Sequence, residues 1–105
     1  MLDSTLVMIT TEFGRTPKIN KDGGRDHWPK LSTLAFAGGG LQVGQVIGRS
    51  TAKAEEPQSD PITLDDLFGT IMHVLFDIEK LRAQATIPRD ILTLLQRGNP
   101  IRELV

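Results

Sequence analysis

The first apolar run of the sequence, at residues 6–10, predicts a β-strand. Long and β-branched side chains occupy consecutive positions, a pattern typical of a strand that is covered on both faces, as in a parallel sheet. Two further strand-like runs follow at residues 33–37 and 45–47, and the second closes a short hairpin-like element at Gly48. A parallel sheet built from these runs alone would be thin, so we expect the chain to be part of a larger fold.

The strongest pattern is an amphipathic helix that begins after Thr63. Apolar side chains return at the spacing of about 3.6 residues that places them on one helix face. Thr63 is a good N-cap residue, and Asp65 and Asp66 lie where the positive end of the helix dipole favours acidic groups. We expect the apolar stripe to pack on a sheet. Its members are Leu64, Leu67, Phe68, Ile71, Val74, Leu75 and Ile78.

Glycine, proline and charged residues predict irregular structure between these elements. Residues 11–30 contain three glycines and two prolines, which is typical of one long loop at a strand end. The glycines at 38–40 predict a tight turn after the second strand, because glycine adopts positive φ values without strain. Residues 49–61 are polar and suit an exposed connection.

The sequence after the amphipathic helix is less regular. Residues 79–84 continue or restart a helix, and Pro88 interrupts it. The apolar run at 91–95 favours a strand, and the Gly-Asn-Pro sequence at 98–100 indicates a turn. The predicted class is therefore α/β, with few strands and one main amphipathic helix.

Composition narrows the possible functions only slightly. The chain has 105 residues, enough for one small unit, and a net charge of -1, which gives no sign of a nucleic-acid partner. It has no cysteine, which excludes a disulfide scaffold and a thiolate metal site. No apolar run approaches the roughly 18 residues that a membrane-spanning helix needs.

Candidate chemistry follows the first strand. Glu12 lies just beyond the end of this strand, where ligands bind in open α/β sheets. Its carboxylate and the imidazole of His27 are metal donors, and the guanidinium groups of Arg15 and Arg25 suit sulfate or phosphate oxygens. Together these four side chains predict a pocket for an oxyanion.

Each of these residues also has an ordinary structural interpretation. A carboxylate at a strand end often binds neighbouring backbone, and a histidine between Asp26 and Trp28 often makes a loop hydrogen bond. Exposed arginines form common but weak ion pairs. Trp28 favours a role as a packing anchor, and His73 a structural role on its helix.

Several motifs resemble one family. They are Glu12-Phe13-Gly14-Arg15-Thr16-Pro17, Gly24-Arg25-Asp26-His27, Ala37-Gly38-Gly39-Gly40, the Asp65, Leu67, Thr70 and Ile71 set, and the closing Arg89-Asp90-Ile91 and Ile101-Arg102-Glu103-Leu104. Together they resemble the sulfatase-like group known as domain of unknown function 1501, which looks like a branch of the alkaline phosphatase superfamily. The resemblance implies that residues 1–105 are the C-terminal part of an alkaline phosphatase-like α/β sandwich. It also implies hydrolysis of small sulfate or phosphate esters with paired divalent metal ions, such as zinc or calcium.

The superfamily pattern implies a strand that ends in Asp-His-Gly, followed by a loop that carries another histidine. Glu12-Phe13-Gly14 occupies the first place and His27 the second, so the resemblance makes Glu12 and His27 metal ligands. Phe13 cannot bind a metal, which weakens or alters one of the two expected sites. An alternative register takes Asp26-His27 as the Asp-His pair, although Trp28 follows it in place of glycine.

The resemblance also implies that the remaining machinery lies elsewhere. No segment here resembles the superfamily's nucleophile region, so the chain alone is expected to be inactive, and the partner is the missing N-terminal part of the same polypeptide. Without that part we expect exposed apolar surface or self-association. Family members usually carry a twin-arginine-type export signal, which implies a periplasmic or extracellular location. The altered motif keeps a second reading open, in which the protein is a non-catalytic, ligand-binding or cell-surface relative.

Overall fold

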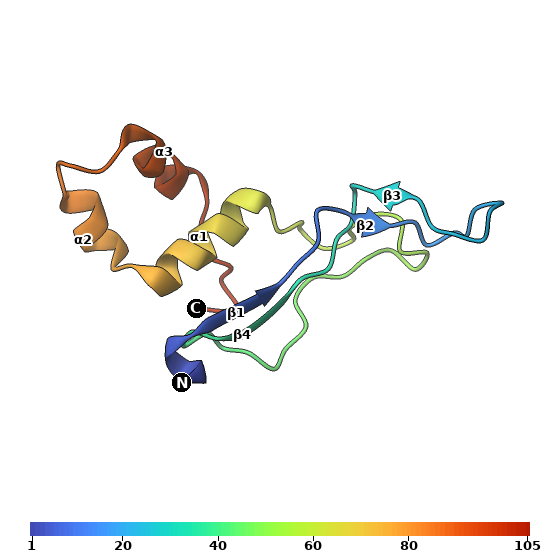
Figure 1. The fold of residues 1–105 in the computed structure, drawn as a ribbon, viewed down its shortest axis with the longest axis horizontal. Coiled ribbons are helices and arrows are strands. Elements are labelled where there is room, and N and C mark those ends of the chain that lie inside the picture. The colour runs from blue at the N-terminus through green and yellow to red at the C-terminus, as the bar shows by residue number, and fades with distance from the viewer.

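The computed structural model describes residues 1–105 as short elements joined by long irregular segments (Figure 1). Strands dominate the first part of the chain and helices the last. In order, the elements are η1 (Leu2–Ser4), β1 (Leu6–Ile9), β2 (Gly14–Arg15), β3 (His27–Trp28), β4 (Ala35–Gly38), α1 (Leu64–Leu75), α2 (Ile78–Ala83) and α3 (Arg89–Arg97).

The predicted strands at 6–10 and 33–37 are present as β1 and β4, but the expected parallel sheet is wrong. The two strands pair antiparallel and form a sheet of their own, with Leu6 opposite Gly38 and Ile9 opposite Ala35. Leu6 packs against the small core, whereas Val7 and Ile9 are 42% and 68% exposed. β1 is therefore not buried on both faces, because α1 and the C-terminal segment (residues 98–105) cover only one of them. The expected exposure of apolar surface is confirmed.

The tight turn predicted at 38–40 is confirmed. All three glycines have positive φ values, of 72°, 65° and 72°. A Cβ atom at Gly38 would lie only 2.3 Å from the backbone oxygens of Leu2 and Thr5. Glycine is therefore required where β4 ends against the start of the chain. The strand and hairpin predicted at 45–48 are wrong, because this segment has no regular structure and Gln45 donates hydrogen bonds to Gln42 O and Glu103 O.

The predicted amphipathic helix is confirmed as α1. The Thr63 hydroxyl accepts a hydrogen bond from the Asp66 N–H, and the Asp66 carboxylate accepts one from the Thr63 N–H, which completes a capping box. Thr70 is fully buried; its hydroxyl donates to Asp66 O and accepts from Ile101 N–H, at 2.8 Å in each case. α1 thus packs against the C-terminal segment as well as against the sheet.

Two helices follow α1. α2 confirms the helix restart expected at 79–84. α3 corrects the strand expected at 91–95. A five-residue apolar run does not distinguish strand from helix, and here Ile91, Leu92 and Leu95 share one inward helix face, with Leu95 buried. The Arg82 guanidinium donates to Leu95 O at 3.0 Å and ties α2 to α3.

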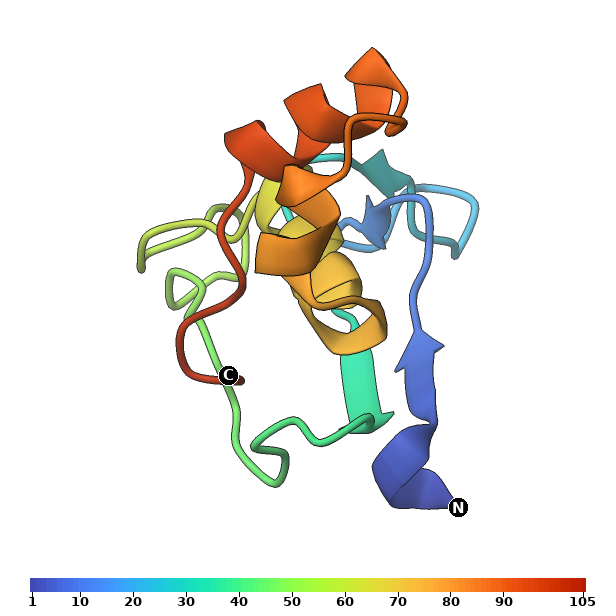
Figure 2. The ribbon, with the colours of Figure 1, turned by 90° about the vertical axis from the view of Figure 1, so that its left-hand side faces the viewer.

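The molecule is elongated, with its helices at one end. It measures 55 × 31 × 23 Å and has a radius of gyration of 16.5 Å, above the roughly 13 Å of a compact 100-residue domain. Figure 2, viewed from the helical end, shows the last residues running beside the segment that follows β4, where Gln42 N–H donates to Leu104 O. None of the helices has the length or apolar character to cross a membrane.

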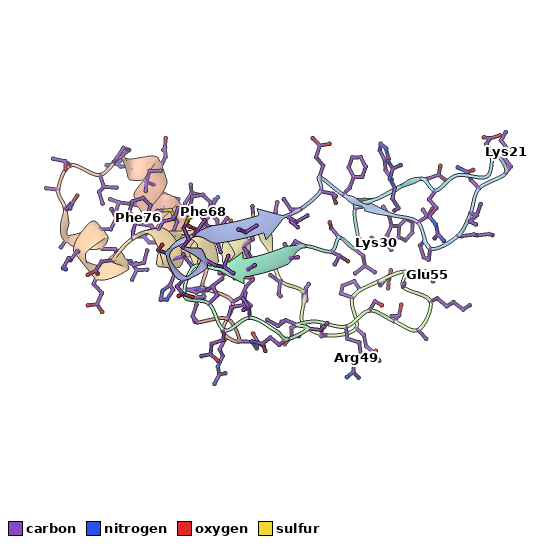
Figure 3. The ribbon with its side chains drawn as sticks, turned by 60° about the horizontal axis from the view of Figure 1, so that its bottom comes forward. Lys21, Lys30, Arg49, Glu55, Phe68 and Phe76 are labelled. Carbon is purple, nitrogen blue, oxygen red and sulfur yellow. The ribbon has the colours of Figure 1, made fainter.

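A slender extension, which we call the hairpin arm (residues 11–30), projects away from the helices. Figure 3 shows Lys21 at its far tip, whereas Phe68 and Phe76 lie at the opposite end of the molecule. None of the residues from 11 to 30 is buried. All predicted site residues lie in this arm.

Candidate metal and oxyanion site in the hairpin arm

The hairpin arm is built on a short antiparallel ladder, which corrects the expectation that residues 11–30 form one irregular loop. β2 pairs with β3, with Gly14 opposite Trp28 and Arg15 opposite His27. The ladder continues one residue further, because Thr16 N–H donates to Asp26 O at 3.0 Å. A Cβ atom at Gly14 would lie 1.8 Å from Leu31 O, so only glycine allows this close backbone approach.

One face of the ladder carries Phe13, Arg15 and His27. The Phe13 and His27 rings stack with their centroids 3.8 Å apart and their planes inclined by 29°. The guanidinium carbon of Arg15 lies 5.7 Å from the centre of the Phe13 ring, within cation–π range. The two polar clusters singled out in the sequence therefore meet in space.

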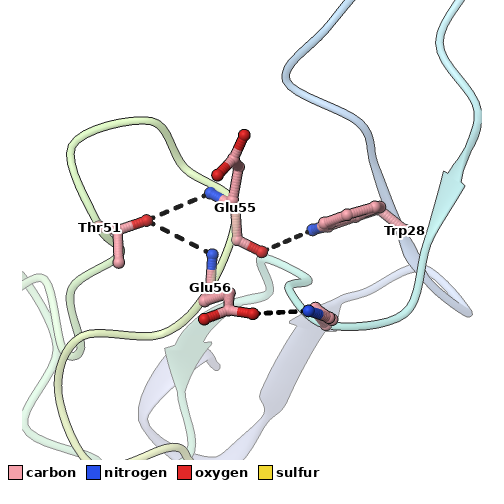
Figure 4. Close-up of polar contacts among 5 residues, drawn as sticks. Trp28, Thr51, Glu55 and Glu56 are labelled. Atoms are coloured by element: carbon pink, nitrogen blue, oxygen red, sulfur yellow. Dashed lines mark hydrogen bonds and ion pairs between the residues drawn. The ribbon is translucent and has the colours of Figure 1, made fainter.

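The other face of the ladder is covered by residues of the connection that follows β4 (Figure 4). The indole N–H of Trp28 donates to Glu55 O at 2.8 Å, and Lys30 Nζ lies 2.5 Å from Glu56 Oε1. The hydrogen bond from Lys30 and its positive charge lower the pKa of the Glu56 carboxyl. The Thr51 hydroxyl accepts from Glu55 N–H at 3.3 Å and from Glu56 N–H at 3.5 Å. Trp28 is thus an anchor, as its size suggested.

The other predicted oxyanion residue, Arg25, is partly engaged within the arm. Its Nη1 donates to Thr16 O at 2.7 Å and to Pro17 O at 2.6 Å. The Arg15 Nη1 donates to Arg25 O at 3.1 Å. One nitrogen of each guanidinium therefore helps to hold the hairpin together.

Asp26, the alternative metal ligand, is committed to the loop at the arm's tip. Its carboxylate accepts a hydrogen bond from the Asn20 side-chain amide at 2.9 Å. The Asn20 side-chain oxygen in turn accepts from the N–H groups of Asp22 and Gly24, at 3.0 and 2.9 Å. One carboxylate oxygen of Asp26 is therefore engaged within the arm.

Glu12 and His27 come from neighbouring segments but are not joined to each other. Both are exposed, and Glu12 lies in the bend just before Phe13. The chain's two ion pairs, Lys30–Glu56 and Lys80–Asp77, involve neither residue. No cluster of three or more His, Cys, Asp or Glu side chains is present.

An open hollow of about 380 Å³ lies toward the tip of the arm. No motif in the sequence indicates this hollow, because its walls come from both sides of the hairpin and from the later connection. Its lining residues are Thr16, Pro17, Lys18, Ile19, Asn20, Lys21, Asp26, Trp28 and Glu55. Phe13 was also missed as a member of the site; the alternation of Phe13 and Arg15 opposite His27 would have revealed it once the strand pairing was known.

The comparison with protein families gives one match. The family described as "Protein of unknown function (DUF1501)" matches residues 1–105. The chain belongs to this family. Neither the curated proteins nor the solved structures gave a significant match.

Proposed function

We propose that this DUF1501 chain is the C-terminal part of an exported, sulfatase-like hydrolase that cleaves sulfate or phosphate esters with the help of divalent metal ions. In this proposal Glu12 and His27 are metal donors, and Arg15 and Arg25 contact the oxygens of the ester. The observation that supports it most directly is the stacking of His27 on Phe13 at 3.8 Å, because it brings the imidazole to the Glu12–Gly14 segment.

The chemistry of the donor set fits a transition metal. Zinc binds both imidazole nitrogen and carboxylate oxygen, whereas calcium takes oxygen ligands. A catalytic zinc site needs about three protein ligands, so at least one further ligand and the nucleophile would come from outside the hairpin arm. When bound, the metal would polarise the ester and activate the attacking group. The chain's own contribution is to present the two donors and the free guanidinium N–H groups on an exposed hairpin.

A second function, ligand binding without catalysis, has its own support. Phe13 occupies the place where the superfamily pattern has a metal-binding histidine. The Nη1 of Arg25 already donates hydrogen bonds to two backbone oxygens of the arm. A protein with one weakened metal site would retain an anion-binding surface and lose turnover.

The test uses the full-length protein that contains residues 1–105. Metal content, sulfatase turnover and phosphatase turnover are measured for the wild type, for His27→Ala and for His73→Ala as a matched control on α1. We expect His27→Ala to lose metal and turnover and His73→Ala to keep both. Unchanged metal content and turnover in His27→Ala would remove His27 from the site, and a wild type that binds metal without turnover would favour the ligand-binding function.

A further inference from the structure

The hollow near the tip of the hairpin arm has the size of a small-ligand site. Its volume of about 380 Å³ lies in the range of small-molecule pockets, roughly 300–1,000 Å³. Thr16, Asp26 and Trp28 line it. Because alternate residues of a strand project from the same face, these three lie on the face of the ladder opposite Arg15 and His27. The hollow is therefore separate from the side that carries Arg15 and His27.

Trp28 supplies a fixed aromatic wall for this hollow. Its indole N–H donates to Glu55 O at 2.8 Å (Figure 4), which restrains the orientation of the ring. Lys30 Nζ lies 5.7 Å from the ring centre, but Lys30 does not line the hollow, so the hollow meets a part of the ring that this cation does not cover. The negative face of an aromatic ring attracts weakly positive C–H groups, such as those on the flat face of a sugar ring.

Three charged side chains around the hollow have unused hydrogen-bonding capacity. Lys18 and Lys21 take part in neither of the chain's two ion pairs, and Figure 3 shows Lys21 at the tip of the arm. Asp26 accepts from the Asn20 side-chain amide through one carboxylate oxygen, and its other oxygen has no protein partner. An ammonium group binds an acidic group, and a carboxylate accepts hydrogen bonds from hydroxyl groups. A fitting ligand therefore carries both.

The charges that line the hollow balance one another. Lys18 and Lys21 are matched by Asp26 and Glu55. A polyanion, such as a nucleic acid or a polyphosphate, is attracted by an excess of positive charge, and this lining has none. The balance favours a ligand with a single acidic group and several hydroxyl groups.

From this arrangement we propose that the hollow binds a saccharide unit with one acidic substituent, a carboxylate or a sulfate. The sugar ring lies on Trp28, the acidic substituent reaches Lys18 and Lys21, and a hydroxyl group donates to Asp26. The inference does not depend on the proposed hydrolysis, because none of its contacts involves Glu12 or the side of the ladder that carries His27.

Binding is tested by the fluorescence of Trp28, the only tryptophan of the chain. The 105-residue chain is titrated with glucuronate, with glucosamine N-sulfate, with their neutral counterparts glucose and N-acetylglucosamine, and with inorganic sulfate. We expect saturable changes in emission with at least one acidic sugar, which also tells a carboxylate substituent from a sulfate, weaker binding of its neutral counterpart, and no change with inorganic sulfate. The absence of a saturable change with either acidic sugar overturns the proposal, as does an equal response to inorganic sulfate.

The role of the lysines is tested with single variants. Lys18→Gln and Lys21→Gln each raise the Kd of the acidic sugar about two- to fivefold, the range that exposed ion pairs support, and leave the neutral sugar unaffected. Lys53→Gln is the matched control, because Lys53 is exposed and does not line the hollow. Unchanged affinity in both hollow variants, or an equal loss in Lys53→Gln, overturns the proposal.

Discussion

At the helical end, α1 packs against α3 and against the C-terminal segment, and buried side chains such as Ile101 and Leu104 hold it together. In the hairpin arm no side chain is buried, and the contacts are a two-residue-pair ladder, an aromatic stack and hydrogen bonds to loop backbone. The two regions therefore depend on different forces. Burial of apolar area contributes most of the stability at the helical end, whereas strand pairing, ring stacking and hydrogen bonds shape the arm.

This difference has a consequence for the candidate site. Loops and hairpins with few buried contacts open locally at a lower free-energy cost than a packed core. The residues proposed as metal and oxyanion donors thus lie on the region whose shape is most easily changed. Changes at the two ends should have separable effects.

The largest expected effect comes from the core of the helical end. Ile101 is 6% exposed and packs with Leu41 and Leu104. We expect Ile101→Ala to lower the free energy of unfolding by about 2–5 kcal/mol, the cost of a cavity in a core. Urea denaturation measures it, with the exposed neighbour Arg102→Ala as control. A loss as small as that of the control would show that the helical end is not held by burial.

A smaller effect is expected from the buried hydroxyl of Thr70. Thr70→Val keeps the shape but leaves the Ile101 N–H without its acceptor, which costs about 1–3 kcal/mol. Thr93 is the matched control, since its hydroxyl makes the same i−4 bond, to Arg89 O at 2.9 Å, at an exposed site. Equal losses of unfolding free energy in Thr70→Val and Thr93→Val would show that the Thr70 hydroxyl does not link α1 to the C-terminal segment.

The capping box makes the helical end sensitive to acid. Hydrogen bonds from the Thr63 N–H and hydroxyl lower the pKa of the Asp66 carboxyl below its usual 3.8. A carboxyl whose pKa is lower in the folded state stabilises the fold above its unfolded pKa, and this contribution disappears as pH falls through the folded value. We expect Asp66→Asn to lose about 1 kcal/mol at neutral pH, with a difference from wild type that shrinks below pH 3.8.

Thermal melts from pH 2 to 7 measure the effect of Asp66→Asn. Asp65→Asn serves as the control, because Asp65 does not take part in the capping box. A difference between wild type and Asp66→Asn that stayed constant across this range would show that the charge of Asp66 does not contribute.

The smallest effect on overall stability is expected in the arm. Trp28→Phe keeps an aromatic side chain but loses the bond to Glu55 O, which costs less than about 1 kcal/mol at this partly exposed site. The local effect is larger: the loop around the exposed Lys53 opens, so cleavage by trypsin after Lys53 becomes faster. Lys30→Met, which removes an exposed ion pair and a cation–π contact with the Trp28 ring but keeps the Trp28–Glu55 hydrogen bond, should change cleavage less. A loss of stability in Trp28→Phe equal to that of Ile101→Ala would contradict the separation of the two regions.

The sequence predicted the elements whose signals are local. The capped helix after Thr63, the turn at 38–40 and the strands at both ends of the arm all follow from spacing, capping or glycine conformation. The wrong assignments depend on distant partners. The run at 91–95 becomes a helix that packs against α1, and β1 pairs antiparallel with β4, a choice that periodicity does not determine.

The sequence predicted which residues belong to the candidate site, but not how they are arranged in space. Residue chemistry and the position after the first strand selected Glu12, Arg15, Arg25 and His27, and the structure brings His27 and Arg15 together. The stacking of Phe13 on His27 and the use of Arg25 to bind backbone oxygens depend on the register of β2 with β3. That register is set by Gly14 lying against Leu31 and by the Trp28 anchor, contacts that no single motif contains.

The most direct test of the account is the proximity of the Phe13 and His27 rings in solution. In a nuclear Overhauser spectrum of the labelled full chain, we expect strong cross-peaks between the Phe13 and His27 ring protons, as their 3.8 Å centroid distance requires. His73 should give no cross-peak to Phe13. Their absence between Phe13 and His27, with the amide spectrum of the helical end intact, would contradict the hairpin arrangement on which the candidate site depends.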